Sequence, residues 1–270
     1  MDSETPAPAN CAKCGTALRA DARFCARCGT RCSPAEPEFL AVAESAHPPK
    51  DTWVAEPVAT TERWDDLRAV AWLYGLLLLT SLICGWGYSV NPDGDFVFWT
   101  TLVDAAVITG FAVYYRNEIL PLLHPSGFDG RAGTMLAIAA AVQFVGLGIA
   151  FYLLEKAGVP VERVTDEIQR HDYSVWQLFA LYSLAPAVFE EIAFRGVIYE
   201  RLRRVLGERE GWLVQAAFFS VLHLSPIIFP THFAMGLILG WLRMRTRSLL
   251  PGMVLHGAWN AAVILLELYQ

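Results

Sequence analysis

Long apolar blocks are the feature of this sequence that most constrains its fold. From about residue 67 to the end, apolar residues come in long runs that few charges interrupt. A helix needs about 20 mostly apolar residues to cross a bilayer. Only 18% of all residues are charged, whereas a soluble domain is nearer about a quarter charged. The sequence therefore predicts an all-α polytopic membrane protein and argues against a water-soluble enzyme.

About seven transmembrane helices are predicted from these blocks. The fifth and sixth are short, and the apolar segment 225–230 between them is expected to stay at membrane depth. Irregular backbone there must be buried in protein or line a wet cavity, which indicates a site near residue 223. The expected helices cover 67–90, 96–115, 132–154, 174–200, 211–224, 231–243 and 249–268.

Charge gives the expected orientation. Eleven arginines fall at the N-terminal side and in alternate loops, against three basic residues in the other loops. By the positive-inside rule, the N-terminus and the arginine-rich loops are predicted to face the cytoplasm. The formal net charge of −6 argues against a general nucleic-acid binder.

Composition divides the chain into three predicted parts. Residues 1–32 hold five of the six cysteines and are expected to form a zinc ribbon. Residues 33–63 are rich in proline and glutamate, so a flexible, disordered linker is predicted there. Residues 64–270 form the transmembrane domain, and the motifs that carry chemistry fall within 174–268.

Two CxxCG knuckles, separated by ten residues, predict a structural zinc site. Each knuckle directs two thiolates to one point, so the pair supplies a tetrahedral sulfur cage. The alternative is a pair of disulfides, which a reducing cytoplasm disfavours. Cys32 is interpreted as a spare thiol and Cys84 as a packing residue. The predicted ligands are Cys11, Cys14, Cys25 and Cys28.

The fourth helix carries two carboxylates and a guanidinium deep in an apolar setting. Glu190 lies eleven residues before Arg201, about 16 Å along a helix at about 1.5 Å per residue. Ionisable residues at such depth are usually functional and face the protein interior. Glu191 and Arg195 are spaced i and i+4 and are expected to pair. Glu190 points about 100° away, which leaves it available for chemistry, and Pro186 is expected to bend the helix.

Other helices carry isolated polar residues. His223 ends an apolar stretch, while His256 and Asn260 share one face at i and i+4. A single histidine of this kind is more often a packing residue, but three helices with inward-capable polar groups indicate a shared site. Asp104 is interpreted as a helix–helix hydrogen-bonding residue. His232 is a further candidate near the site, although a residue at a helix end near the membrane surface is the favoured interpretation.

Three motifs occur in a fixed order: EExxxR at 190–195, FxxxH at 219–223 and HxxxN at 256–260. Their combination resembles the CPBP family (CaaX protease and bacteriocin-processing, or Abi) of intramembrane endopeptidases. Phe233 to Gly236 also fits the family pattern, and the resemblance covers 174–268. It shows no motif match in 67–173. The ribbon resembles the zinc modules that precede many bacterial membrane proteins, so a bacterial plasma membrane is the expected location.

The resemblance implies a role for each motif residue. Glu190, with His223, would activate a water for attack on a peptide carbonyl, and His256 with Asn260 would donate hydrogen bonds to the oxyanion. Glu191 and Arg195 would hold the helix and tune Glu190. The older description of the family as metalloproteases leaves a zinc set of Glu190, His223 and His256 open. The absence of HExxH and the donor-like His–Asn pair favour the metal-free interpretation.

The expected substrate is a membrane-embedded or lipidated protein or peptide. An alternative is a catalytically silent membrane scaffold or immunity protein that recruits partners through its ribbon. A transporter is a third class, but neither repeated halves nor matching broken helices are found by inspection. The ribbon is expected to contact a cytoplasmic protein rather than nucleic acid.

Overall fold

The structure is a computed structural model, and it describes residues 10–11, 13–17, 25, 27–28, 60–125, 128–159 and 163–269. The chain divides between Ala55 and Glu56 into two units, each of which is treated on its own below. The expected linker and Cys32 lie outside the described residues, except that the last linker positions, 60–63, already belong to a helix. Those first turns are polar, so an apolar run starting at residue 67 does not reveal them.

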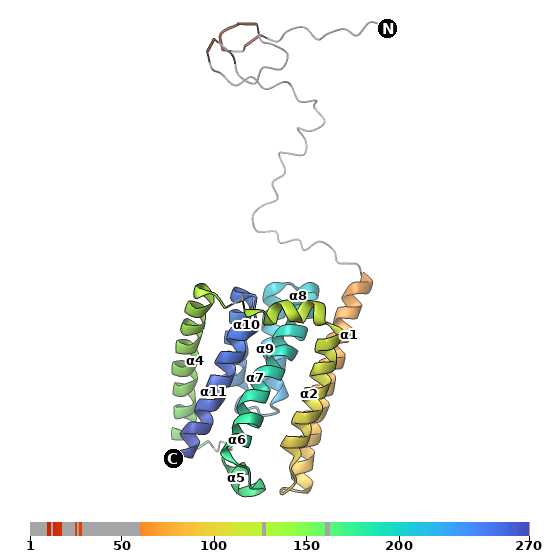
Figure 1. Cartoon of the computed structure of the whole chain (residues 1–270), viewed down its shortest axis with the longest axis vertical. Coiled ribbons are helices and arrows are strands. Elements are labelled where there is room, and N and C mark those ends of the chain that lie inside the picture. The colour runs from red at the N-terminus through yellow and green to blue at the C-terminus, as the bar shows by residue number, and fades with distance from the viewer. Residues whose placement is uncertain are drawn as a thin grey trace. The chain divides into compact units, whose positions relative to one another are not determined.

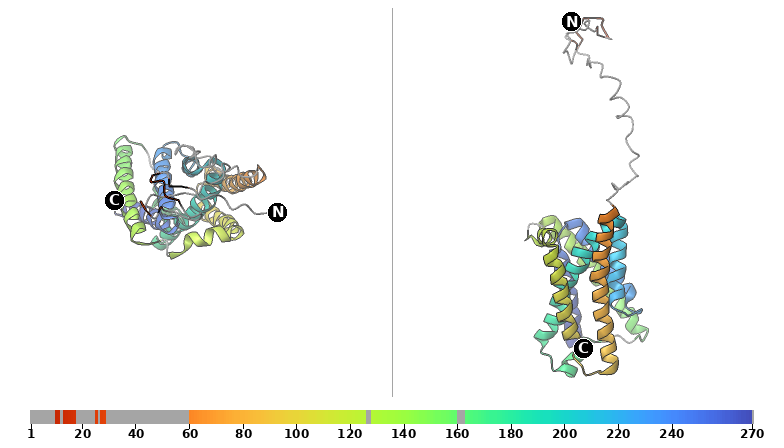
Figure 2. Two further views of the ribbon diagram at one scale, coloured as in Figure 1. Left: turned by 90° about the horizontal axis from the view of Figure 1, so that it is seen from above. Right: turned by 90° about the vertical axis from the view of Figure 1, so that its right-hand side faces the viewer.

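The second unit is a bundle of roughly parallel helices (Figures 1 and 2). Among the described residues it contains helices and loops only, which confirms the predicted all-α class. Four of its helices are long and apolar enough to cross a membrane. They are α1 (Thr60–Val90), α2 (Phe96–Tyr114), α4 (Gly130–Lys156) and α11 (Leu250–Leu268).

The remaining expected ranges are helical as well. Residues 175–206 form one unbroken helical run that alternates between α and the wider π geometry. Pro186 lies just after the first π segment, where its missing N–H removes an α-helical hydrogen bond. The run consists of α6 (Val175–Leu178), η3 (Phe179–Leu184), α7 (Ala185–Glu190), η4 (Glu191–Ile198) and α8 (Tyr199–Leu206).

Helices α9 (Glu208–Leu222) and α10 (Phe229–Thr246) form a hairpin. The irregular segment between them runs from residue 223 to 228, close to the expected 225–230. The hydroxyl of Ser220 donates to the carbonyl of Phe229 at 2.6 Å and ties the two helix ends together. The loop therefore returns the chain directly beside His223.

One end of the bundle is joined by ion pairs between α1, α3 (Arg116–Ile119) and α8. Arg201 binds Asp66 at 2.8 Å and Glu118 at 2.5 Å, and Arg204 binds the other oxygen of Glu118. The ring of Tyr115 lies 4.0 Å from the Arg201 guanidinium carbon and covers it. Arg201 and Arg204, which both follow the fourth expected helix, thus hold three helices together at this end.

A close approach between α8 and α9 gives a test of the packing. A Cβ added at Gly211 would lie 2.8 Å from the backbone nitrogen of Arg203, so Gly211→Ala must push the two helices apart. We expect a loss of about 1–3 kcal/mol of stability, as for overpacked cores. Gly146→Ala on α4 is the matched control, because its Cβ would meet open space. Thermal unfolding in one detergent compares them, and equal midpoints would contradict the described packing.

Candidate active site

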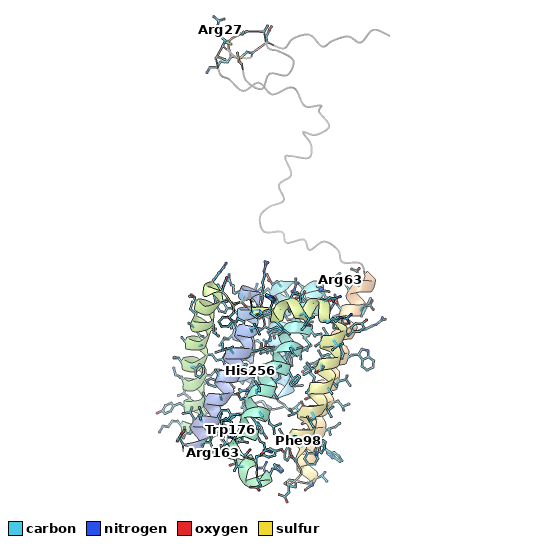
Figure 3. All side chains as sticks on the ribbon, in the orientation of Figure 1. Arg27, Arg63, Phe98, Arg163, Trp176 and His256 are labelled. Carbon is cyan, nitrogen blue, oxygen red and sulfur yellow. The ribbon has the colours of Figure 1, made fainter. Side chains whose placement is uncertain are left out.

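The site is built around the junction of α7 and η4, where Glu190 ends one segment and Glu191 begins the next. All of η4 except Ile192 is buried. His256 on α11 lies beside this junction. Figure 3 shows His256 well inside the bundle, between Arg63 near one end and Arg163 near the other. His256 therefore lies away from both ends of the bundle.

Glu191 and Arg195 form the predicted ion pair. Arg195 donates from one guanidinium nitrogen to Glu191 Oε1 at 2.9 Å, and the two side chains are 0% and 1% exposed. The Arg195 guanidinium also lies over the ring of Phe219, with its carbon 4.5 Å from the centroid. Helix α11 can approach this pair because residue 252 is glycine: a Cβ there would lie 2.9 Å from Glu191 Oε2. The pair is confirmed.

His256 contacts Glu191 with one ring nitrogen and faces Glu190 with the other. Its Nδ1 lies 3.1 Å from Glu191 Oε1, and its Nε2 lies 3.9 Å from Glu190 Oε2. An ionised carboxylate only accepts hydrogen bonds, so Nδ1 carries the hydrogen. A second carboxylate thus orients the imidazole and directs Nε2 toward Glu190. This contact between helices 65 positions apart was not part of the sequence prediction, which paired Glu191 with Arg195 alone.

His223 ends α9 and belongs to an aromatic group around Phe219. Its Nδ1 donates to the carbonyl of Phe219 at 2.9 Å, which leaves Nε2 of the neutral ring as an acceptor. The ring centroid of Phe219 lies 5.1 Å from that of His223 and 6.0 Å from that of His256. The phenylalanine of the FxxxH motif therefore lies against both histidines. The motif alone did not predict this role.

His232 lies beside His223, which agrees with its interpretation as a further candidate near the site. Its ring centroid is 4.0 Å from that of His223, and the residue is half-buried. The reason is the short α9–α10 loop, which folds the start of α10 back against the end of α9. The nine-residue spacing of the two histidines across a hairpin was the available signal.

Asn260 is one helical turn beyond His256 on α11 and is half-buried. Within the part of the chain that the structure describes, its side chain makes no hydrogen bond or ion pair. The structure therefore brings together Glu190, Glu191, Arg195 and His256, and joins His223 to them through Phe219. Asn260 shares the helix of His256 without joining these contacts.

A small cavity opens beside Glu190. Its volume is about 70 Å³, room for about two water molecules at about 30 Å³ each. Its walls come from α1, α2, α7, η4 and α9 and are mainly apolar. The carboxylates of Glu190 and Asp104 are the two acidic groups among the residues that line it. Asp104 also accepts a hydrogen bond from Thr80 at 2.6 Å, which confirms the predicted contact between helices.

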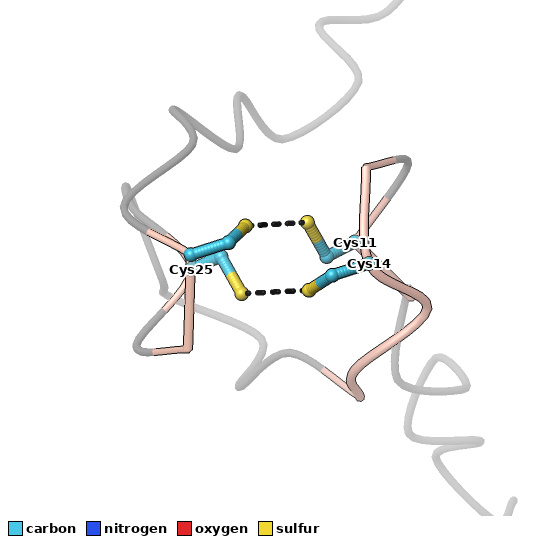
Figure 4. Close-up of side chains that lie close together, drawn as sticks. Cys11, Cys14 and Cys25 are labelled. Atoms are coloured by element: carbon cyan, nitrogen blue, oxygen red, sulfur yellow. Dashed lines mark hydrogen bonds between the residues drawn. The ribbon is translucent and has the colours of Figure 1, made fainter.

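The first unit holds the four predicted zinc ligands together. Cys11 Sγ lies 3.6 Å from Cys28 Sγ, and Cys14 Sγ lies 3.6 Å from Cys25 Sγ (Figure 4). A disulfide would need about 2.05 Å, whereas four sulfurs at about 2.3 Å from a zinc ion lie about 3.8 Å apart. A hydrogen bond with the Thr16 hydroxyl lowers the pKa of the Cys14 thiol to about 6, which suits a thiolate ligand.

The alternative zinc set does not gather in the same way. Among the described residues, the four cysteines are the group of three or more potential ligands whose donor atoms all lie within 4.8 Å of one another. Glu190, His223 and His256 do not form such a group. His256 faces Glu190 at 3.9 Å, whereas His223 is linked to His256 through the ring of Phe219.

Fold and site together define a helical integral membrane protein with a buried carboxylate–imidazole cluster, preceded by a cysteine module. Residues 172–262 match the family model described as type II CAAX prenyl endopeptidase Rce1-like, and residues 10–31 match that of a zinc-ribbon domain. The chain therefore contains a CAAX prenyl endopeptidase family domain and an N-terminal zinc ribbon, as the motif resemblance predicted. No curated protein and no solved structure was found to match it.

Proposed function

We propose that this protein is an intramembrane endopeptidase that hydrolyses a peptide bond of a membrane-associated, lipidated protein with water activated by Glu190. The family match supports a CAAX protease activity. The observation that carries the proposal is the arrangement of Glu190, which borders a water-sized cavity and faces a histidine held in place by a second carboxylate.

In the proposed reaction, Glu190 takes a proton from water while the water oxygen attacks the carbonyl carbon. The Nε2 lone pair of neutral His223 would assist this step. When the C–N bond breaks, Glu190 would return its proton to the leaving amine. Each atom of the water then ends in the two products, and no serine or cysteine nucleophile is required.

His256 and Asn260 would stabilise the oxyanion of the tetrahedral intermediate. Since Nδ1–H of His256 is committed to Glu191, donation from Nε2 requires the imidazolium form. With two carboxylates and one guanidinium beside it, an imidazolium would complete a cluster of zero net charge. Asn260 would meet the oxyanion from the next turn of α11.

The test of this function uses the purified full-length chain and a farnesylated CaaX peptide, with the same peptide lacking the lipid as comparison. Mass spectrometry should find cleavage after the prenylated cysteine. Cleavage carried out in H₂¹⁸O should place one heavy oxygen in the new carboxylate. No cleavage across a panel of prenylated and unprenylated membrane peptides would favour the silent scaffold. Loss of activity with a chelator that leaves the ribbon folded would favour a catalytic metal.

Domain roles and orientation belong to the same proposal. We assign residues 1–32 to the ribbon, 33–63 to a linker and 64–270 to the protease domain, with the N-terminus in the cytoplasm of a bacterium. The clustering of Arg201, Arg204 and their partners at the bundle end that contains the start of α1 supports that orientation. The ribbon would hold a structural zinc and bind a cytoplasmic protein.

The zinc proposal predicts a clear metal stoichiometry. Purified protein should carry one zinc per chain, and Cys25→Ser should lose it, because three sulfurs and a hydroxyl bind zinc far more weakly than four thiolates. Cys84→Ser on α1 is the control and should keep the metal. Elemental analysis by mass spectrometry measures both. Equal zinc content in the two variants would contradict the four-cysteine site.

A further inference from the structure

Asp104 lies outside the family-matched residues, on α2, yet it borders the same cavity as Glu190. The cavity is lined otherwise by apolar side chains and by Thr101, so Glu190 is the titratable group that faces Asp104 there. A cavity with room for about two waters that is bordered by two carboxylates is suited to hold water. Polar groups in such a space are expected to share the water between them.

The partner of Asp104 is suited to either protonation state. The Thr80 hydroxyl lies 2.6 Å from Asp104 Oδ1 and 2.8 Å from the carbonyl of Leu77, but it has a single hydrogen. When Asp104 is ionised, Thr80 can donate to the carboxylate. When Asp104 is protonated, it can donate to the Thr80 oxygen while Thr80 donates to Leu77. Asp104 therefore keeps a hydrogen-bond partner whether or not it holds a proton.

We propose that Asp104 is a positioning residue of the hydrolytic site, which orients the cavity water against Glu190 and exchanges a proton with Glu190 through that water. The inference rests on the proposed endopeptidase function and extends it to helices α1 and α2. In the exchange, the water passes one proton to the Asp104 carboxylate and receives one from the Glu190 carboxyl group. No bond to carbon changes, and charge is conserved.

The exchange has a purpose in the reaction cycle. Glu190 must be ionised to take a proton from the attacking water. A resting Glu190 that holds a proton can pass it to Asp104 through the cavity water, which ionises Glu190 before attack. Within each turnover, Glu190 then returns the proton that it takes from the attacking water to the leaving amine. Orientation of the water by two acceptors also lowers the entropy cost of attack.

The decisive experiment measures cleavage of the farnesylated CaaX peptide by wild-type protein and by Asp104→Asn. The amide keeps the shape of the side chain and an oxygen that can accept a hydrogen bond from Thr80, but it takes up no proton in the pH range of the assay. We expect kcat to fall about 10-fold or more with KM within about twofold, in line with the effects of acid–base groups. The acid limb of the kcat–pH profile should move, and Asp104→Glu should recover part of kcat.

Asp95→Asn is the matched control. Asp95 caps the same helix by accepting from the backbone N–H of Phe98 at 3.2 Å, and it does not line the cavity. Its kcat and pH profile should equal those of wild type. Thermal unfolding in detergent shows whether each variant is folded. Thr80→Val is a second variant, for which we expect a smaller fall of kcat and a shift of the acid limb in the same direction. It tests the proposal if Asp104→Asn does not fold.

The outcomes separate this inference from the function on which it rests. If wild type cleaves, Glu190→Gln does not, and Asp104→Asn keeps the wild-type kcat and pH profile, Asp104 has only its structural contact and the inference is overturned. A loss that appears equally in Asp95→Asn, or that follows thermal stability alone, overturns it too. If wild type cleaves no prenylated peptide, the proposed function and this inference fail together.

Discussion

Glu190→Gln should reduce cleavage of a prenylated peptide by about 10³-fold, within the range for removal of a general base. The amide has nearly the same shape but is not a base near neutral pH, so water in the cavity is no longer activated. His256 Nε2 lies 3.9 Å from the Glu190 carboxylate, beyond hydrogen-bond distance, and the Glu190 side chain is 26% exposed. The substitution should therefore cost little stability.

The measurement is kcat/KM beside the thermal unfolding midpoint. Glu155→Gln on the exposed face of α4 makes the same chemical change away from the site and should leave both quantities at wild-type values. A Glu190→Gln protein that is folded and cleaves within about tenfold of wild type would remove this residue from the role of base. The same conclusion would follow if the activity fell only in proportion to the fraction of protein that is unfolded.

Arg195→Met should lower the free energy of unfolding by about 3–5 kcal/mol, the usual effect of removing one partner from a buried ion pair. Glu191 would then be a buried carboxylate without its guanidinium, at 1% exposure. The guanidinium also packs over the ring of Phe219, and its loss opens a space there. Denaturant unfolding in a fixed detergent measures the change.

The double variant Glu191→Gln/Arg195→Met separates the two contributions. Because it removes both charges, it should recover much of the stability that Arg195→Met loses, a non-additivity of the kind expected for contacting groups. It should not recover activity, since the orienting carboxylate of His256 is gone as well. Simple addition of the two single effects would show that the buried charge is compensated elsewhere.

Local spacing accounts for most of what the sequence could predict. The i and i+4 pair of Glu191 and Arg195, the apolar helices, and the sulfur cage follow from positions close in the chain. The break before α10 also follows, since Pro230 lies at its start. Each of these depends on helix geometry or turn chemistry, which a short window of residues determines.

Contacts across helices could not be obtained in the same way. The second role of Glu191, as the partner of His256, depends on how closely α11 packs at Gly252. The position of His232 depends on the path of a loop, and the cavity shared by Glu190 and Asp104 depends on four helices and η4 meeting at once. Pairwise spacing within one segment contains no information on these distances.

The π-helical segment η4 has a consequence for anyone who inserts or deletes residues in this protein. Compared with an α-helix, a π turn accommodates an additional residue, so α8 leaves the site in a phase that an ordinary helix would not produce. Deleting one residue within 191–198 to restore regular winding would rotate α8 by about 100°. Arg201 would then face away from Asp66 and Glu118, and the ion pairs at that end of the bundle would be lost. The motif residues outside the deletion would be unchanged.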